Sequence, residues 1–240
     1  YKALPYGISD FGQIRNESLY LVDKSMYIET MEKAGHFLFL IRPRRFGKSL
    51  FLSMLRRYYD INEKDSFQEM FKGLWIAEHH TQNQGKFQVL HLDFSQIGGS
   101  VEDLPKKFNQ YFGVMLDSFM DRYAAYYPER IVNAVYQKED ADGKFAIIAA
   151  AAKNASHRLY LIVDEYDNFT NAVLNEHGEA VYHAMTHASG FYRDVFKKFK
   201  GNFDRILMLG VSPVTLDDLT SGYNIATSIT MDARFNQMLG

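Results

Sequence analysis

The sequence has 240 residues, of which 47% are hydrophobic and 15% aromatic, so it suits a packed globular domain and excludes collagen-like and disordered chains. Having no cysteine, it excludes a disulfide scaffold, a cysteine-ligated zinc site and a thiol enzyme. Its net charge of −2 disfavours a general polyanion binder. The longest apolar run, Phe145 to Ala152, is far shorter than the ~18 residues of a membrane span. We therefore expect a cytoplasmic protein without a membrane partner.

Short apolar runs alternate with amphipathic stretches along the chain, and no linker rich in Pro, Gly or Ser divides it. This alternation predicts one α/β domain over residues 1–240, with a mostly parallel sheet flanked by helices. The runs show no polar alternation, which is typical of strands covered on both faces. Strands are predicted, in chain order, at Phe37–Ile41, Val89–Phe94, Leu159–Val163, Arg205–Leu209 and, as a shorter candidate, Ile225–Ile229.

Apolar residues recur at helical spacing between these strands, and we expect the aromatic ones to be core rather than a platform for stacking bases. One helix face carries Glu179, His183 and His187. We favour a solvated face there over a metal site, because two His residues without a third ligand are weak support for a metal. Helices are predicted at Gly47–Tyr59, along the stripe of Leu104, Phe108, Phe112, Leu116 and Phe119, at Phe145–Lys153 and at Glu179–Phe199.

The segment Arg42–Ser49 connects the first strand to the helix that follows it. Phosphate loops have Gly, four residues, Gly, Lys, then Ser or Thr. The last three positions match, whereas Arg42 stands where the first Gly is usual. The strand–loop–helix setting compensates for this mismatch, because a helix N-terminus offers phosphate unpaired N–H groups and a partial positive charge. Gly-Lys-Ser alone is common by chance, so this setting is what favours a phosphate site.

Each residue type in the loop suits a bound nucleotide. Gly47 lets the backbone approach phosphate closely. Lys48 supplies a mobile positive charge for the β- and γ-phosphates, and Ser49 offers a hydroxyl to Mg²⁺, which prefers oxygen ligands. The predicted nucleotide-binding residues are Arg44, Arg45, Phe46, Gly47, Lys48, Ser49 and Leu50.

A second motif ends the strand at Leu159–Val163, where two carboxylates follow as Asp164 and Glu165. Asp164 suits the metal and its water shell, and Glu165 suits orientation or deprotonation of an attacking water. Any buried strand must end in something polar, so this pair alone is a weak signal. Ligands bind at the carboxyl ends of parallel strands, and the pair therefore predicts the same site as the phosphate loop.

The segment Arg42–Ser49 resembles the signature of the AAA-ATPase-like family, which are bacterial P-loop proteins often described as predicted AAA-ATPases. The resemblance spans nearly the whole chain, and the family shares the loop without its first Gly. Further similar stretches are Tyr20–Ser25, Leu92–Ser95, Asp164–Asp167, Leu209–Pro213 and the segment that begins at Asn224.

This resemblance implies a P-loop NTPase with a RecA/AAA-type sheet, with ATP and Mg²⁺ as its ligands. Lys48 and Ser49 would carry the phosphate and Mg²⁺ roles, Asp164 the metal role, and Glu165 the role of activating water. Ser212 falls where such proteins carry a polar sensor of the γ-phosphate, usually Asn. Family members commonly continue into a nuclease-like domain of the PD-(D/E)XK type. The adenine would lie against the segment before the first strand, with Asp10, Phe11 and Tyr20 as candidates.

Three functions remain open at this point. The first is an ATP-binding domain that hydrolyses the β-γ bond. The second is a nucleotide-gated module with little turnover that controls a fused or associated effector, which the hydroxyl at Ser212 favours. The third is an ATPase that processes nucleic acid, which the near-neutral charge disfavours; Lys197, Lys198 and Lys200 are better explained as cations at a helix C-terminus. The oligomeric state cannot be read from the sequence.

Overall fold

Five strands form a parallel sheet over the residues that the computed structural model describes, which are 1–98, 100–168, 178, 180, 191–212 and 226–239. The strand order is β2-β3-β4-β1-β5, so β4 separates the strand before the phosphate loop from the strand before the acidic pair. The predicted α/β class and its mostly parallel sheet are confirmed. The strands are β1 (Phe37–Ile41), β2 (Phe87–Asp93), β3 (Arg158–Asp164), β4 (Arg205–Gly210) and β5 (Thr227–Ser228).

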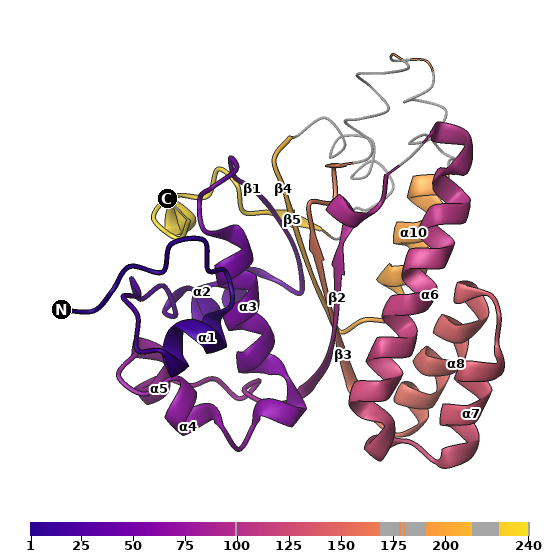
Figure 1. The fold of residues 1–240 in the computed structure, drawn as a ribbon, viewed down its shortest axis with the longest axis horizontal. Helices are drawn as coiled ribbons and strands as arrows, with labels where there is room; N and C mark the ends of the chain where they lie inside the picture. The colour runs from indigo at the N-terminus through magenta and orange to yellow at the C-terminus, as the bar shows by residue number, and fades with distance from the viewer. Residues whose placement is uncertain (99, 169–177, 179, 181–190, 213–225, 240) are drawn as a thin grey trace.

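Helices cover both faces of the sheet (Figure 1). Helices α1 to α5 lie on one face, and α6, α7, α8 and α10 lie on the other, each group with its own hydrophobic core. Among the described helices, none is both long and apolar enough to cross a bilayer. Their bounds are α1 (Phe11–Asn16), α2 (Tyr27–Ala34), α3 (Lys48–Tyr59), α4 (Phe67–Met70), α5 (Trp75–Glu78), α6 (Leu104–Tyr123), α7 (Glu129–Gln137), α8 (Ala141–Asn154) and α10 (Phe191–Lys200).

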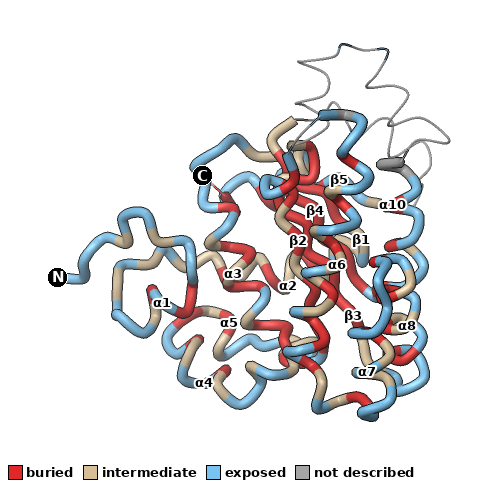
Figure 2. The backbone as a smooth tube through the Cα atoms, turned by 45° about the vertical axis from the view of Figure 1, so that its right-hand side comes forward, coloured by how far each residue is buried: buried red, intermediate tan, exposed pale blue. Residues whose placement is uncertain are grey.

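Strand β3 shows why the apolar runs lack alternation. Tyr160 and Ile162 belong to the core on the α3 side, whereas Leu161 and Val163 belong to the core on the α6 side. Successive side chains of a strand point to opposite faces, so both sets must be apolar when helices cover both faces. Figure 2 shows this burial along the strands and on the inner sides of the helices.

Some predicted boundaries differ from the structure. Strand β2 begins at Phe87 rather than Val89, because its first residues continue the ladder with Arg158 and Leu159. Helix α8 begins at Ala141 rather than Phe145, since the Asp140 side chain caps it by accepting a hydrogen bond from the Gly143 amide at 2.6 Å. Helices α1, α2, α4, α5 and α7 were not predicted. The start of the helix expected from Glu179 lies outside the described residues.

Strand β2 lies at the edge of the sheet, and α6 protects that edge. The Val89 amide donates to the Tyr123 hydroxyl at 2.8 Å, and the Asp93 amide donates to the Tyr111 hydroxyl at 2.7 Å. Unpaired edge amides invite another chain to add a strand. The two tyrosines of α6 therefore satisfy amides that a sixth strand would otherwise bind.

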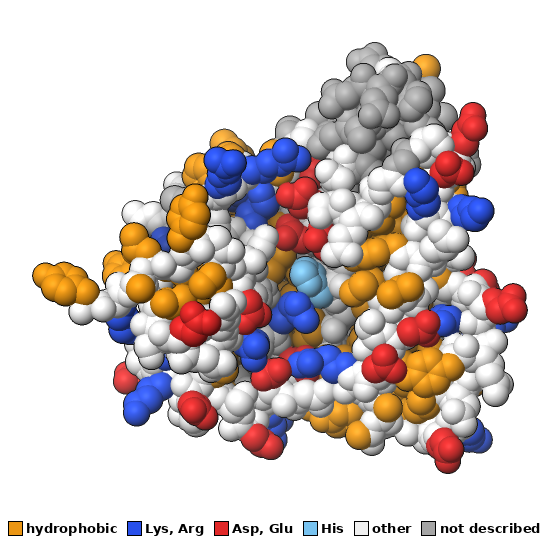
Figure 3. Space-filling model, in the orientation of Figure 1, with side chains coloured by type: hydrophobic (Ala, Val, Ile, Leu, Met, Phe, Trp, Pro, Cys, Tyr) orange, Lys and Arg blue, Asp and Glu red, His pale blue; other side chains and the backbone are white. Residues whose placement is uncertain are grey.

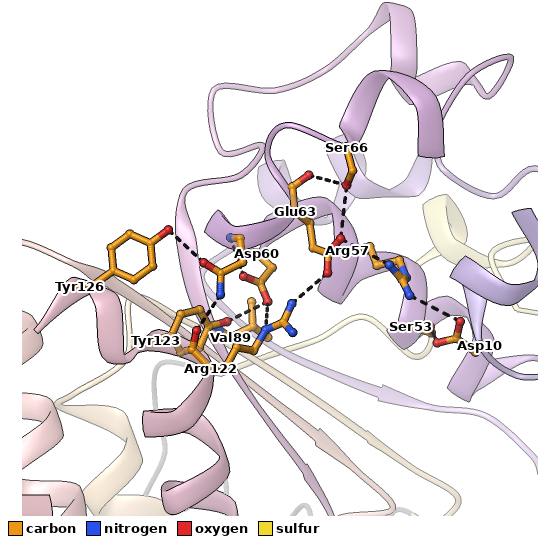
Figure 4. Close-up of polar contacts among 11 residues, drawn as sticks. Asp10, Ser53, Arg57, Asp60, Glu63, Ser66, Val89, Arg122, Tyr123 and Tyr126 are labelled. Atoms are coloured by element: carbon orange, nitrogen blue, oxygen red, sulfur yellow. Dashed lines mark hydrogen bonds and ion pairs between the residues drawn. The ribbon is translucent and has the colours of Figure 1, made fainter. Parts of the chain in front are cut away.

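A buried polar network ties α6 to the end of α3 (Figure 4). Asp60, 4% exposed, accepts hydrogen bonds from Arg122 Nε at 2.7 Å and from the Tyr123 hydroxyl at 2.8 Å. The same hydroxyl accepts from Val89, so one carboxylate organises the edge of the sheet, the C-terminus of α3 and the last turn of α6.

Asp60→Ala is expected to lower the free energy of unfolding by about 2–4 kcal/mol, because it leaves a buried tyrosine hydroxyl and an arginine without their acceptor. Urea denaturation measures the loss. As a control, Asp194→Ala removes a surface carboxylate that pairs with Lys197 at 3.5 Å, and it should leave stability unchanged within error. Equal effects of the two substitutions would contradict the structural role of Asp60.

Candidate functional site

The phosphate loop turns from β1 into α3 through two residues with left-handed backbone. Arg45 has φ 66° and Gly47 has φ 79°. A Cβ at Gly47 would meet no atom within 4 Å, so the requirement for glycine here is conformational rather than steric. Helix α3 begins directly after Gly47, and the unpaired amides of its first turn therefore lie at the loop.

Lys48 is buried within this loop, with 6% of its surface exposed. Its Nζ donates to the backbone carbonyls of Arg42 and Pro43, each at 3.1 Å. A buried ammonium needs acceptors, and these two carbonyls provide them. The charge is therefore held inside the turn where phosphate oxygens would have to lie.

The two residues predicted to hold the metal lie together. Ser49 Oγ donates a hydrogen bond to Asp164 Oδ2 at 3.3 Å. They meet because β1 and β3 are parallel members of one sheet, so the loop after β1 and the carboxylate ending β3 lie at the same edge. A serine hydroxyl and a carboxylate are the oxygen ligands that Mg²⁺ uses beside its waters, so this pair fits the ion.

The environment of Asp164 favours a bound cation. Burial, with a smaller contribution from the negative charges of Asp93 and Glu165, raises the pKa of Asp164 to about 6, although a hydrogen bond from the Glu165 amide and the charge of Lys48 act to lower it. Asp93 is the register partner of Asp164 on β2. A divalent ion here would offset the repulsion among these carboxylates.

Glu165 follows Asp164 with φ 50°, a left-handed backbone that costs a non-glycine residue roughly 1–2 kcal/mol. The next residues hold it in place. The Tyr166 amide donates to the Leu209 carbonyl of β4 at 3.1 Å, and the Asn168 amide donates to the Glu165 carbonyl at 2.9 Å. The turn keeps the half-buried Glu165 beside Asp164 rather than continuing the strand.

Ser212 follows the end of β4, and its backbone is fixed by the residues after the acidic pair. Asp167, 1% exposed, accepts from the amides of Val211 at 3.1 Å and Ser212 at 2.5 Å. The Tyr166 hydroxyl donates to the Ser212 carbonyl at 3.2 Å. Gly210 is required here, since an added Cβ would lie 2.4 Å from the Tyr166 ring. The turn carrying Glu165 and the loop carrying Ser212 are therefore joined.

An apolar pocket of about 260 Å³ lies beside the loop. Phe46, Gly47 and Leu50 line one part of it, so the pocket and the phosphate loop are continuous. Phe11 and Tyr20, two of the residues expected near adenine, line it as well. Figure 3 shows hydrophobic, basic and acidic side chains meeting on this upper part of the molecule.

Asp10, the third residue expected near adenine, has a different role. It caps α1 by accepting from the Gln13 amide at 2.7 Å and also accepts from the Ser53 hydroxyl at 3.2 Å. Asp is a preferred N-cap residue, and Asp10 directly precedes the first residue of α1, so the sequence did carry a signal for this role.

Comparison with known protein families gives the family of the chain. A family model described as Predicted AAA-ATPase matches residues 5–220. The chain belongs to this family. As a member of the AAA-ATPase-like family, it is an AAA-type nucleotide-binding domain.

Two individual proteins are similar to this AAA-ATPase-like chain. An "Uncharacterized protein in vnfD 5'region" of Azotobacter chroococcum mcd 1 is 27% identical over 243 residues, covering 100% of this chain and 43% of that protein. The chain thus spans less than half the length of this relative. Cdc6p from Pyrobaculum aerophilum, known from a crystal structure, matches 87% of this chain and 45% of its own at 10% identity and a TM-score of 0.39. The fold assignment rests on the sheet itself and not on this distant likeness.

The remaining candidates of this AAA-ATPase-like chain are placed as follows. Arg44 and Arg45 are exposed at the loop, available to a ligand. Glu179, His183 and His187 lie outside the described residues. Within the described part of the chain, no group of three or more His, Asp or Glu residues is arranged to hold a metal.

Sequence reasoning missed Asp167. It gave Asp164 a role in binding metal and Glu165 a role in activating water, and it gave no role to Asp167, which lies two residues after Glu165. The only signal for the role of Asp167 in binding two backbone amides was its position in this short polar segment.

Proposed function

We propose that the chain binds MgATP at the phosphate loop and hydrolyses its β-γ phosphoanhydride bond, with the described residues acting as one nucleotide-binding unit. The observation that carries the proposal is the 3.3 Å contact between Ser49 Oγ and Asp164 Oδ2 at the start of α3. It joins two motifs that lie 115 residues apart in the sequence, at the edge of the sheet where parallel strands bind ligands.

The phosphates would lie over the first turn of α3. Its free amides and the helix dipole favour negative charge, and Lys48 would exchange its two carbonyl acceptors for phosphate oxygens. Ser49 and Asp164 would hold Mg²⁺, which neutralises charge that develops on the phosphates. Glu165, held beside them by its turn, would orient the attacking water and accept its proton.

The base would enter the apolar pocket beside the loop. Flat aromatic and aliphatic walls suit a purine ring, and Phe11, Tyr20 and Phe46 supply them. The continuity of this pocket with Gly47 supports a ligand that has both a base and phosphates.

Glu165→Gln is expected to lower kcat for ATP hydrolysis by at least about 100-fold, because a positioned general base contributes about 10²–10⁴-fold. The dissociation constant for ATP should stay within about threefold, since the charge removed does not contact the phosphates. Phosphate release and calorimetric titration measure the two effects. Glu139→Gln, in an exposed segment, is the control and should change neither.

A nucleotide-gated module with little turnover is the second candidate. It is supported by Ser212, whose backbone is joined to the Glu165 turn through Asp167. A nucleotide that moves the Glu165 turn would therefore also move the loop that carries Ser212. ATP binding without measurable phosphate release by the unsubstituted chain would favour it. The nuclease-like effector implied by the resemblance remains a prediction within this second candidate.

A further inference from the structure

Arg42, which stands where phosphate loops usually have glycine, makes three hydrogen bonds away from the phosphate turn. Its Nη1 donates to the carbonyls of Ile41 at 2.9 Å and Thr230 at 3.0 Å. Its Nη2 donates to the carbonyl of Phe235 at 3.1 Å. A guanidinium presents its donors as a rigid fork, so it can hold two carbonyls five residues apart in one geometry. The side chain is thus committed to the segment after β5.

That segment, residues 229–239, is attached to the rest of the chain at several points. The Ile41 amide donates to Thr230 Oγ1 at 3.0 Å, at the end of β1. Near the other end, Lys24 Nζ donates to the Gln237 carbonyl. Phe235 is fully buried between them. The segment is therefore attached at Thr230 to the end of β1 and at Gln237 to the chain before α2.

The same segment forms one wall of the pocket beside the loop. Met238 and Leu239 line the pocket together with Phe46 and Gly47, and are 1% and 4% exposed. Lys24 lines it too. Lys24 thus both holds the segment and borders the pocket that the segment closes. Met238 and Leu239 lie beyond the end of β5 at Ser228, so strand pairing does not hold them in the pocket wall.

We infer that Arg42 is a positioning residue for the base: it holds the wall formed by Met238 and Leu239 and so gives the site its preference for a nucleotide over a bare phosphate chain. This inference rests on the proposed function. It explains why the loop tolerates arginine at a glycine position, because the side chain is used on the segment behind the loop and not on the phosphates. Phosphate binding is then left to Lys48 and the amides of α3.

The test compares MgATP with magnesium tripolyphosphate, which has phosphates and no base. Arg42→Ala is expected to weaken ATP binding about tenfold, the effect of losing roughly 50 Å² of apolar contact with the base. Tripolyphosphate binding should change less than about twofold, since its contacts do not involve the wall. Calorimetric titration measures both. Arg44→Ala, an exposed arginine of the same loop, is the matched comparison and should weaken both ligands alike.

A second variant tests the inference if Arg42→Ala alters folding, and hydrogen exchange tests the contact of Arg42 with the segment directly. Met238→Ala leaves the loop intact and should also weaken ATP and spare tripolyphosphate. Hydrogen exchange of the ligand-free chain should show faster exchange at the Phe235 and Met238 amides in Arg42→Ala than in Arg44→Ala, because these amides close the turn that Arg42 holds.

The inference is overturned if Arg42→Ala weakens both ligands equally, if it weakens neither, or if exchange in residues 229–239 is unchanged. These results differ from failure of the proposed function. If the proposed function is wrong, the unsubstituted chain binds neither ATP nor tripolyphosphate, and the inference is overturned together with the proposed function.

Discussion

Lys48→Ala is expected to weaken MgATP binding by about 100-fold, because a hydrogen bond to a charged group contributes roughly 1.5–3 kcal/mol and each 1.4 kcal/mol is tenfold. The loss should be large because Lys48 is the buried cation of the loop and already lies inside the turn, 3.1 Å from the carbonyls of Arg42 and Pro43. Little rearrangement would therefore be needed to reach phosphate. Calorimetric titration of MgATP measures the change.

The matched control is Lys33→Ala. Lys33 is largely exposed on α2 and pairs with Glu29 within its own helix. Its removal should leave ATP affinity unchanged, because its charge lies outside the loop and is screened by solvent. Equal affinities of the Lys48 and Lys33 variants for MgATP would show that the loop is not the phosphate site.

Asp164→Asn is expected to stabilise the chain in the absence of nucleotide and metal, even though it removes a metal ligand. Folding raises the pKa of Asp164 from 3.8 to about 6, mainly through burial. The stabilisation by the protonated carboxyl is complete below pH 3.8 and is lost as the pH rises through about 6. At pH 8 the ionised group therefore costs up to about 3 kcal/mol, at 1.36 kcal/mol per pKa unit. Asn keeps an acceptor for the Glu165 amide without the charge.

Chemical denaturation at pH 8 and pH 5, without Mg²⁺, measures this effect. The gain from Asp164→Asn at pH 5 should be roughly half of that at pH 8, because the difference in protonation between the folded and unfolded carboxyl develops between pH 3.8 and about 6. Added Mg²⁺ should stabilise the unsubstituted chain and not the variant. Asp65→Asn, at an exposed position, should show no such pH dependence. A variant less stable than the unsubstituted chain at pH 8 would contradict the description of Asp164.

The strands that carry the site could be predicted because they are buried on both faces. Such strands read as unbroken apolar runs, as in Phe37–Ile41 and Leu159–Val163. The prediction that Ser49 and Asp164 share a site used one further rule, that ligands bind at the carboxyl ends of parallel strands. The structure places these two side chains in contact.

Other parts of the site depend on strand order and backbone partners, which leave no pattern in the sequence. Asp167 binds the Val211 and Ser212 amides because β4 lies beside β3, and adjacency of strands cannot be read from their residues. Arg42 binds backbone carbonyls of a distant segment, and a carbonyl is present at every residue. The unusual loop residue was visible in the sequence, whereas its partners were not.

The same reasoning explains the missed helices. Helices α4 and α5 have four residues each, too few for an apolar period to appear. They are held by contacts outside themselves, such as the Trp75 amide, which donates to Asp23 Oδ2 at 2.7 Å. Asp23 belongs to the Tyr20–Ser25 stretch, so one residue of the family resemblance has a structural role at the start of α5.

The most direct test of the central claim is a crystal structure with Mg²⁺ and a non-hydrolysable ATP analogue. The account predicts phosphates over the first turn of α3, Mg²⁺ between Ser49 and Asp164, Lys48 moved from its two carbonyls to the phosphates, and adenine between Phe11 and Met238. A nucleotide bound elsewhere, with Lys48 still on the carbonyls of Arg42 and Pro43, would contradict it.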